Sequence, residues 1–212
     1  MLSLKNSLAV LKKTEALKEG HFVLSSGLHS PKYVQCAKLL SFPDKAEKLC
    51  KSLALKIKKN YKKIDVILSP AIGGIVIGYE IGRILKKETI FCERVNGKFQ
   101  LRRGFAIKPK SKVLIIEDVI TTGKSSMECT KLIKKSKSFL VGFACIIDRS
   151  SKNNLKIKKK ITSQVKLNIP TYNKKNLPDY LKKFLLPLLE AEDFNDKSWS
   201  KYRSCCNCQE CT

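Results

Sequence analysis

Two adjacent carboxylates, Glu117 and Asp118, stand where an apolar stretch of the sequence meets a loop rich in hydroxyl groups and glycine. Such a loop, opening a helix, offers free backbone N–H groups and the positive end of the helix dipole to a phosphate. Gly123 lets the backbone come close to that phosphate. The two hydroxyls of a ribose would donate to the acid pair. The segment therefore predicts a site for ribose 5-phosphate.

The same segment has two other interpretations. Gly123, Lys124 and Ser125 also match the ending of the G-x-x-x-x-G-K-[ST] loop of nucleoside triphosphatases. The first glycine of that loop would have to be residue 118, and the carboxylate of Asp118 would face the phosphates. A chance helix cap beside solvated acids is the third interpretation. We favour the ribose phosphate site because a strand, an acid pair and a hydroxyl-rich loop coincide.

These residues need a strand that ends at the acids and a helix that begins at the loop. Residues 112–117 are apolar enough for a strand buried on both faces, and a helix should run from the loop to about Lys135. A second unit of strand, glycine turn and helix covers residues 65–87. Asn96-Gly97, between two alternating segments of residues 94–105, predicts a projecting β-hairpin. The pattern predicts an α/β fold with a mostly parallel central sheet flanked by helices.

Further elements are expected towards both ends of the chain. Ser3 can cap a first helix that ends at Gly20, and a second amphipathic helix follows Pro43. We interpret His21 and His29 as loop residues, too few and too separated for a metal site. The remaining expected segments are strands at residues 89–93 and 139–147, a lysine-rich loop at 151–160, an edge strand at 161–167 and a terminal helix at 177–194.

The formal charge of +25 can indicate a polyanion partner. The excess is nearly all lysine, however, whereas nucleic-acid surfaces usually draw on the arginine fork. We therefore expect solvated lysine-rich surfaces and no nucleic-acid partner. Because no run of about 18 apolar residues occurs, we also expect a cytoplasmic protein without a membrane segment.

The nine cysteines fall into two groups. Five lie in apolar surroundings and are typical of small core residues in a reducing compartment: Cys36, Cys50, Cys92, Cys129 and Cys145. Four crowd into one short tail, whereas structural zinc usually takes its ligands from two separated knuckles: Cys205, Cys206, Cys208 and Cys211. For this tail we favour a flexible end over a metal site.

The stretch IIEDVITTGKS resembles the signature of type I phosphoribosyltransferases, which bind 5-phospho-α-D-ribose 1-diphosphate (PRPP). Three further stretches narrow the resemblance to the orotate phosphoribosyltransferases: GHFVLSSGLHSPKYVQCA, FCERVNGKFQLRRGF and IIDRS. The resemblance covers about residues 17–149, in the family's order. It implies a single domain over residues 1–195, with an N-terminal segment to about 40, a core to about 150 and a C-terminal extension, followed by a Cys-rich tail at 196–212.

The resemblance also implies a reaction and a set of roles. The enzyme would be a glycosyltransferase of pyrimidine biosynthesis that transfers ribose 5-phosphate from PRPP to orotate, giving orotidine 5'-phosphate and diphosphate. Catalysis would rest on Lys98, Glu117 and Asp118, and the orotate would be bound by Thr121, Arg149 and Tyr33. The acid pair would hold the ribose hydroxyls. The other PRPP-binding residues would be Gly73, Arg94, Lys98, Val119, Ile120, Thr121, Thr122, Gly123, Lys124 and Ser125.

The family further implies Mg²⁺ and a homodimer with shared active sites. The metal would be bound chiefly through diphosphate and ribose oxygens, so no direct protein ligand is expected. Lys98 would act in the neighbouring subunit's site. Members often carry lysine where Ser25 and Gly73 stand here, and Arg102 or Arg103 is our hypothesis for the missing charge.

Two other functions stay open on the sequence alone. One is a phosphoribosyltransferase for a purine or another pyrimidine. The other is a regulator that senses PRPP and uses its lysines on nucleic acid, for which an added helix-turn-helix or RNA-binding module would be expected.

Overall fold

The computed structural model describes residues 1–24, 26–151 and 155–183. Residue contacts group the chain into two compact units. The first consists of residues 1–17 and 34–168, and the second of residues 18–33 together with residues from 169 onward. The expected single domain over residues 1–195 stays a prediction.

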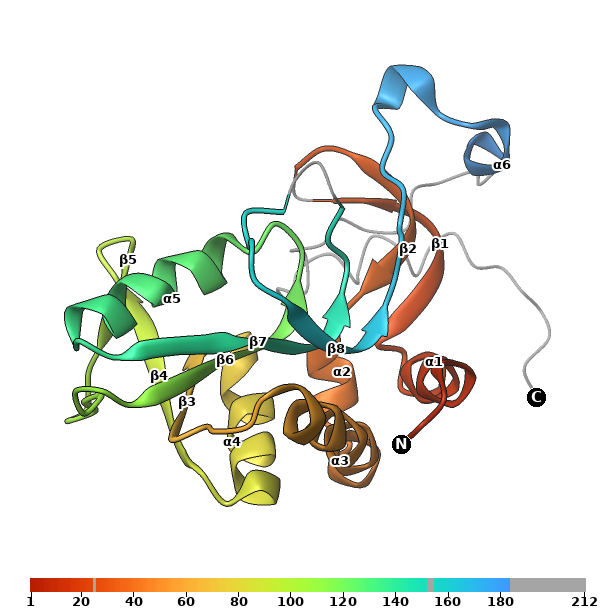
Figure 1. Cartoon of the computed structure of the whole chain (residues 1–212). Coiled ribbons are helices and arrows are strands. Elements are labelled where there is room, and N and C mark those ends of the chain that lie inside the picture. The colour runs from red at the N-terminus through yellow and green to blue at the C-terminus, as the bar shows by residue number, and fades with distance from the viewer. Residues whose placement is uncertain (25, 152–154, 184–212) are drawn as a thin grey trace. The chain divides into compact units, whose positions relative to one another are not determined.

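The first unit is built on a six-stranded sheet with the order β5-β4-β3-β6-β7-β8 (Figure 1). β5 runs antiparallel to β4, and the other neighbouring pairs are parallel, which confirms the predicted mostly parallel α/β sheet. β8 lies at the edge, as expected. The strands are β3 (Val66–Pro70), β4 (Glu88–Val95), β5 (Lys98–Leu101), β6 (Lys112–Ile120), β7 (Phe139–Asp148) and β8 (Ile161–Lys166).

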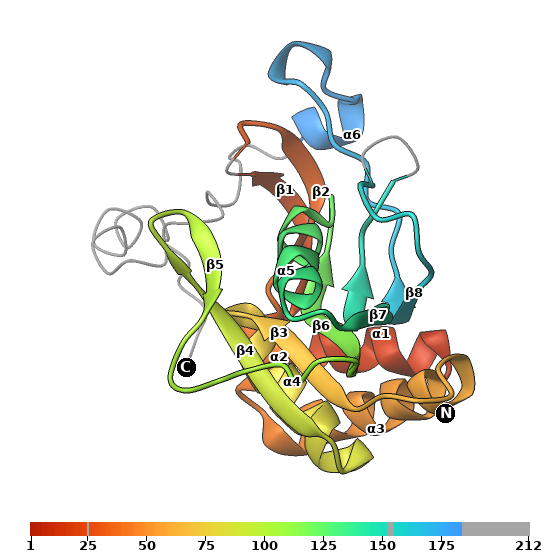
Figure 2. The same ribbon diagram turned by 60° about the vertical axis from the view of Figure 1, so that its left-hand side comes forward.

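Helices cover both faces of this sheet (Figures 1 and 2). The apolar run of β6 explains why both faces are buried: Leu114 and Ile116 pack in one core cluster with α1, α3 and α4, and Val113 and Ile115 pack in the other with α5. Residues 113–117 of β6 are buried on both faces, so this part of the strand needs no polar alternation. The helices of this unit are α1 (Leu4–Lys13), α2 (Cys36–Leu40), α3 (Pro43–Asn60), α4 (Gly73–Leu85) and α5 (Lys124–Lys135).

β4 and β5 form the predicted hairpin. Val95 pairs with Lys98 across its end, and Cys92 pairs with Leu101. The two turn residues between the strands, Asn96 and Gly97, have φ angles of 49° and 75°. Positive φ at both positions defines a type I′ turn. Asn and Gly both accept positive φ, and for this reason the dipeptide predicted the hairpin.

The predicted first helix is wrong at its C-terminal end. It begins as expected, with the Ser3 hydroxyl accepting from the backbone N–H of Asn6 at 3.2 Å. It ends at Lys13 instead of Gly20, because Glu15 takes a left-handed backbone with φ of 54°. The residues that follow form β1 (Leu17–Val23), a strand that the leucine spacing did not predict.

In the second unit, β1 pairs with β2 (His29–Val34) in a two-stranded sheet. The interpretation of His21 and His29 as separated loop residues is wrong. They lie on these two strands with His21 Nε2 2.6 Å from His29 Nδ1, because strand pairing brings distant residues side by side. His29 also bridges to Tyr172, near η1 (Lys174–Asn176) and α6 (Asp179–Lys182). The helix expected over residues 177–194 starts at α6 after Pro178, and residues 184–194 lie outside the described part.

The five scattered cysteines are buried and free, as predicted. The four tail cysteines lie outside the described residues. Within the described part of the chain, no helix has both the length and the apolar character that a membrane crossing requires.

Candidate active site

The acid pair lies at the carboxyl end of β6, in the middle of the sheet. Ser126, fully buried in the first turn of α5, donates a hydrogen bond to Glu117. The backbone N–H of Val119 donates to Asp118 Oδ1 at 2.8 Å. The central strand therefore carries both carboxylates to the sheet edge, and each is already oriented by a donor from the segment that follows.

Burial governs the electrostatics of the pair. Removal from water raises the pKa of Glu117 to about 7, a net value in which the hydrogen bonds from Ser126 oppose the rise and the neighbouring Asp118 adds to it. Burial also raises the pKa of Asp118, against the donation from Val119. Hydroxyl donors from a bound sugar would favour the charged carboxylates, so the pair is suited to a diol ligand.

The loop after the acids, residues 119–125, lines a groove of 130 Å³ together with Glu117. We call residues 119–125 the phosphate loop. Thr121, Thr122 and Lys124 are exposed there, and α5 begins at Lys124, so its first N–H groups are available to an anion. Gly123 has a φ of 71°, and a Cβ at this position would lie 2.7 Å from side-chain atoms of Ile157. Both conformation and space require glycine here.

A second glycine brings another loop against the acid pair. β3 ends at Pro70 and α4 begins at Gly73, so residues 69–74 contain the glycine turn predicted between a strand and a helix. The Ala71–Ile72 peptide bond in this turn is cis. A Cβ on Gly73 would lie 2.7 Å from Asp118 Oδ2. The two loops therefore meet at Asp118.

Arg149 follows β7, the strand next to β6 in the sheet. Its backbone N–H donates to the carbonyl of Ile120 at 2.8 Å, and the preceding Asp148 accepts from the backbone N–H of Ser150 at 2.8 Å. These bonds fix the turn directly beside the phosphate loop. The structure thus brings Arg149, Gly73, the acid pair and the phosphate loop together.

The hairpin residues lie in a different setting. Arg94 forms an ion pair with Glu128 of α5 at 2.8 Å, and its guanidinium lies over the ring of Phe99. Arg103 pairs with Glu93 at 2.7 Å. Lys98 is exposed, and within the described residues no hydrogen bond or ion pair joins it to the acid pair. The structure therefore does not bring the hairpin cations to the carboxylates.

Tyr33 lies on β2 in the second unit, where its ring stacks on Phe22 with centroids 5.6 Å apart. Its role in orotate binding stays a prediction. Ser25, where the family often has lysine, lies outside the described residues.

The sequence did not predict the contacts of two residues near this site, Ser126 and Glu128. Ser126 lies just after the loop, and its buried hydroxyl donates to Glu117. Glu128, which pairs with Arg94, lies four residues after Lys124 on the same helix. An acid close after the loop in a strongly basic sequence was a signal for such a partner.

Comparisons with known proteins agree on one family. The family profile described as phosphoribosyl transferase domain matches residues 42–174. The chain is 48% identical over 145 residues to an orotate phosphoribosyltransferase of Erythrobacter litoralis (strain HTCC2594), a match that covers 68% of this chain and 75% of the relative.

Two solved structures share the fold. The orotate phosphoribosyltransferase of Francisella tularensis is 26% identical with a TM-score of 0.56, over 70% of this chain and 72% of that one. The enzyme of the same name from Aeropyrum pernix is 22% identical with a TM-score of 0.62, over 75% of this chain and 92% of that one.

Proposed function

The chain belongs to the orotate phosphoribosyltransferase family, and from that membership and its site we propose its reaction. It transfers ribose 5-phosphate from PRPP to orotate and releases diphosphate. A bond forms between a ring nitrogen of orotate and the anomeric carbon, and that nitrogen loses its proton to solvent. The bond from the anomeric carbon to the diphosphate oxygen breaks, and its electron pair leaves with the diphosphate. The product, orotidine 5'-phosphate, belongs to pyrimidine biosynthesis.

One observation carries the proposal: a buried acid and a half-buried acid, Glu117 and Asp118, lie at the end of β6 beside a groove formed by backbone at the start of α5. In this proposal the acid pair binds the ribose hydroxyls, and the phosphate loop binds the 5-phosphate with Val119, Ile120, Thr121, Thr122, Gly123, Lys124 and Ser125. The reaction asks little covalent chemistry of the protein. The acids and loop act by holding the sugar in one orientation while charge develops on its ring.

The orotate is assigned to the neighbourhood of Arg149. Its guanidinium is suited to a planar carboxylate, and its backbone is bonded to the phosphate loop. Thr121 and Tyr33 are the further candidates for contact with the base. Arg149 thus becomes the specificity residue, since uracil and the purines carry no such carboxylate.

The diphosphate needs positive charge. Mg²⁺ fits beside two carboxylates, Glu117 and Asp118, whose oxygens are the donors that this ion prefers, and most of its ligands would come from substrate oxygens. When bound, the metal would neutralise the leaving group. Lys98 and Arg94 are proposed to supply the protein's share of charge, and Gly73 gives room for the diphosphate where the two loops meet.

In the proposed homodimer, Lys98 acts on the acid pair of the neighbouring subunit, because it does not lie beside the acid pair of its own chain. α4 and the residue before it offer a face for such contact: Ile72, Val76 and Tyr79 fall on one stripe, and their side chains are 86%, 52% and 66% exposed. A second copy of the chain would cover these side chains. In this arrangement each site takes its acids from one subunit and its lysine from the other.

Hybrid dimers test whether the active sites are shared between subunits. Lys98→Ala and Asp118→Ala homodimers should each be inactive. A random equimolar mixture of the two variants should recover about a quarter of the wild-type activity, because about half of its dimers are hybrids and one of the two sites in each hybrid is complete. No recovery, with hybrid formation verified by tagged subunits, would contradict shared sites.

The reaction itself is tested by orotate consumption, followed by ultraviolet absorbance with purified protein, PRPP and Mg²⁺. We expect loss of orotate that requires both co-reactants, and no turnover of uracil, hypoxanthine or adenine. Arg149→Gln should lower turnover of orotate far more than it lowers PRPP binding. Turnover of another base would overturn the substrate, and tight PRPP binding without any turnover would favour a regulator.

A further inference from the structure

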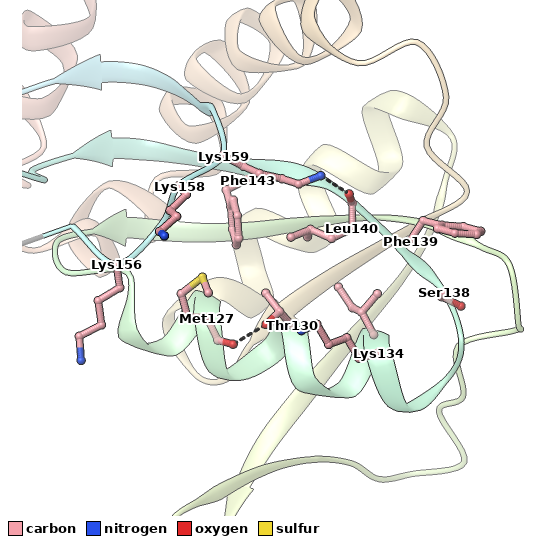
Figure 3. Close-up of a pocket in the computed structure, with 11 residues that line it drawn as sticks. Met127, Thr130, Lys134, Ser138, Phe139, Leu140, Phe143, Lys156, Lys158 and Lys159 are labelled. Atoms are coloured by element: carbon pink, nitrogen blue, oxygen red, sulfur yellow. Dashed lines mark hydrogen bonds between the residues drawn. The ribbon is translucent and has the colours of Figure 1, made fainter.

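A hollow of 470 Å³ lies on the α5 side of the sheet, away from the groove of the phosphate loop. Figure 3 shows Met127, Thr130 and Lys134 of α5 along one side, and Leu140 and Phe143 of β7 along the other. The segment that precedes β8 closes one end with Lys156, Lys158 and Lys159. We call this the lysine-rimmed hollow. Its volume is in the range of small-molecule sites, about 300–1,000 Å³.

Its lining joins an apolar floor to a cationic rim. Phe143 is fully buried in the floor, whereas Met127 and Leu140 are partly exposed, so these two side chains offer a flat ring its apolar contact. Lys159 is engaged, because its ammonium group donates to the carbonyl of Leu140 at 3.0 Å.

The other rim lysines are available to an anion. Among the residues that the structure describes, no carboxylate forms an ion pair with Lys134, Lys156 or Lys158, and the lining contains no acid. Three cations without counter-charge around an apolar floor match a ligand that has an aromatic ring and an anionic group.

Both walls of the hollow are continuous with the phosphate loop. α5 begins where that loop ends, at Lys124. The opposite wall is tied to the loop by the backbone N–H of Lys156, which donates to the carbonyl of Thr122 at 2.9 Å, and by Ile157, which packs against Gly123. A ligand that draws the two walls together would therefore act on the loop.

We propose that the lysine-rimmed hollow is a second ligand site that binds an organic phosphate with an aromatic ring, the chemistry of a nucleoside monophosphate. The ring lies on Met127 and Leu140, and the phosphate lies at the end of the hollow that Lys156 and Lys158 form. Binding changes the affinity of the phosphate loop for its own ligand through the Lys156 and Ile157 contacts, and by linkage that ligand changes the affinity of the hollow equally. Only this coupling rests on the proposed function; the binding itself does not.

The first test is calorimetric titration of the full-length protein with uridine 5'-monophosphate. The double variant Lys156→Glu/Lys158→Glu should weaken one binding event at least about tenfold, because it replaces attraction by repulsion. The control Lys135→Glu reverses the charge of an exposed lysine of α5 that does not line the hollow, and should bind like the wild type. Uridine and inorganic phosphate, which each lack one half of the ligand, should bind at least about tenfold more weakly than the monophosphate.

A second variant separates loss of the ligand site from a folding defect of the charge-reversed protein. Thr130→Trp keeps every lysine but fills the hollow, and should remove the same binding event while orotate turnover without nucleotide stays at the wild-type level. Unchanged binding in both variants would overturn the site, whatever the enzyme's activity. Phosphate binding as tight as that of the monophosphate would overturn the role of the apolar floor.

The coupling is tested by the KM for PRPP. Saturating uridine 5'-monophosphate should change this KM at least about threefold more in the wild type than in Thr130→Trp, because competition within the active site is common to both proteins. Equal changes in the two proteins would overturn the coupling and leave the binding result standing.

Discussion

The acid pair with its phosphate loop and the β4–β5 hairpin are two parts of one proposed active site, but they differ in the burial of their functional groups. At the end of β6 the functional groups are buried or backbone-borne, and each carboxylate has a donor within the same unit. On the hairpin they are long exposed side chains. Two of the hairpin arginines are paired with glutamates, Arg94 with Glu128 and Arg103 with Glu93.

This difference separates two tasks. The buried part can hold a sugar phosphate in one orientation, since its geometry is fixed by the sheet and by glycines that allow close approach. The hairpin can bring charge to a leaving group and withdraw it, at little cost to the fold, because exposed ion pairs contribute little stability. We therefore expect substitutions in the buried part to change binding or stability, and substitutions on the hairpin to change rate.

The largest effect should come from Lys98. Lys98→Ala is expected to lower kcat about 10²–10³-fold, the loss typical of one charge-stabilising group, while the Kd for PRPP and the melting temperature stay close to wild type. Steady-state kinetics, calorimetry and thermal unfolding measure the three quantities.

Arg102→Ala and Arg103→Ala are the matched controls for Lys98. A loss in either arginine variant comparable to that of Lys98→Ala would support our hypothesis that an arginine replaces the missing family lysine. Little change in both would count against it. Of the two, Arg102 is the better candidate, because Arg103 is held by Glu93.

The second effect is on stability and its pH dependence. Burial holds the pKa of Glu117 at about 7, above the ordinary value of 4.5, so the folded state binds this proton more tightly than the unfolded state. The free energy of unfolding should therefore fall as pH rises from 4.5 to 7. Above pH 7 the buried carboxylate is charged, and its ionisation destabilises the fold in full. Glu117→Gln removes the ionisation and should stabilise the protein at pH 8 by about 2 kcal/mol, while activity is lost.

Denaturant unfolding at pH 5 and pH 8 measures that difference. Glu88→Gln, which alters an exposed acid, should retain the wild-type pH slope. A wild-type protein whose stability does not fall between these two pH values would contradict the burial of an ionisable Glu117.

The third effect concerns Gly73. Its Cβ position lies 2.7 Å from Asp118 Oδ2, so Gly73→Ala must displace that carboxylate and should raise the Kd for PRPP about tenfold. A double-mutant cycle isolates the cause. In an Asp118→Ala background the alanine at residue 73 should have almost no further effect, and an undiminished effect there would place the damage elsewhere.

The sequence was informative where local chemistry decides structure. The run KVLIIE predicted a strand buried on both faces, and Asn96-Gly97 predicted the hairpin, because the first depends only on apolar side chains and the second only on backbone conformation. The acid pair and the phosphate loop followed from one continuous segment. Their close approach to Gly73 could not be predicted, since it depends on how α4 and β6 pack.

The failures share a physical cause. The first helix ended early because a single left-handed residue, Glu15, breaks a pattern of leucines that is otherwise helical. The contact between His21 and His29 depends on strand pairing, and the ion pair between Arg94 and Glu128 depends on where the hairpin meets α5. Pairings between distant segments are set by tertiary packing, which neither residue type nor local spacing encodes.

The smallest change in PRPP binding should come from the Arg94–Glu128 ion pair. It tests directly whether the hairpin moves while the acid pair stays fixed. If Arg94 leaves Glu128 to bind diphosphate, Glu128 competes with the substrate. Glu128→Gln should then tighten PRPP binding about twofold to threefold, within the range of a partly exposed ion pair, whereas Arg94→Gln should weaken it. The paired change in Kd is measured by calorimetry at low and high salt, because screening should shrink both effects. Weaker binding in both variants would mean instead that the hairpin acts while docked on α5, as a fixed part of the site.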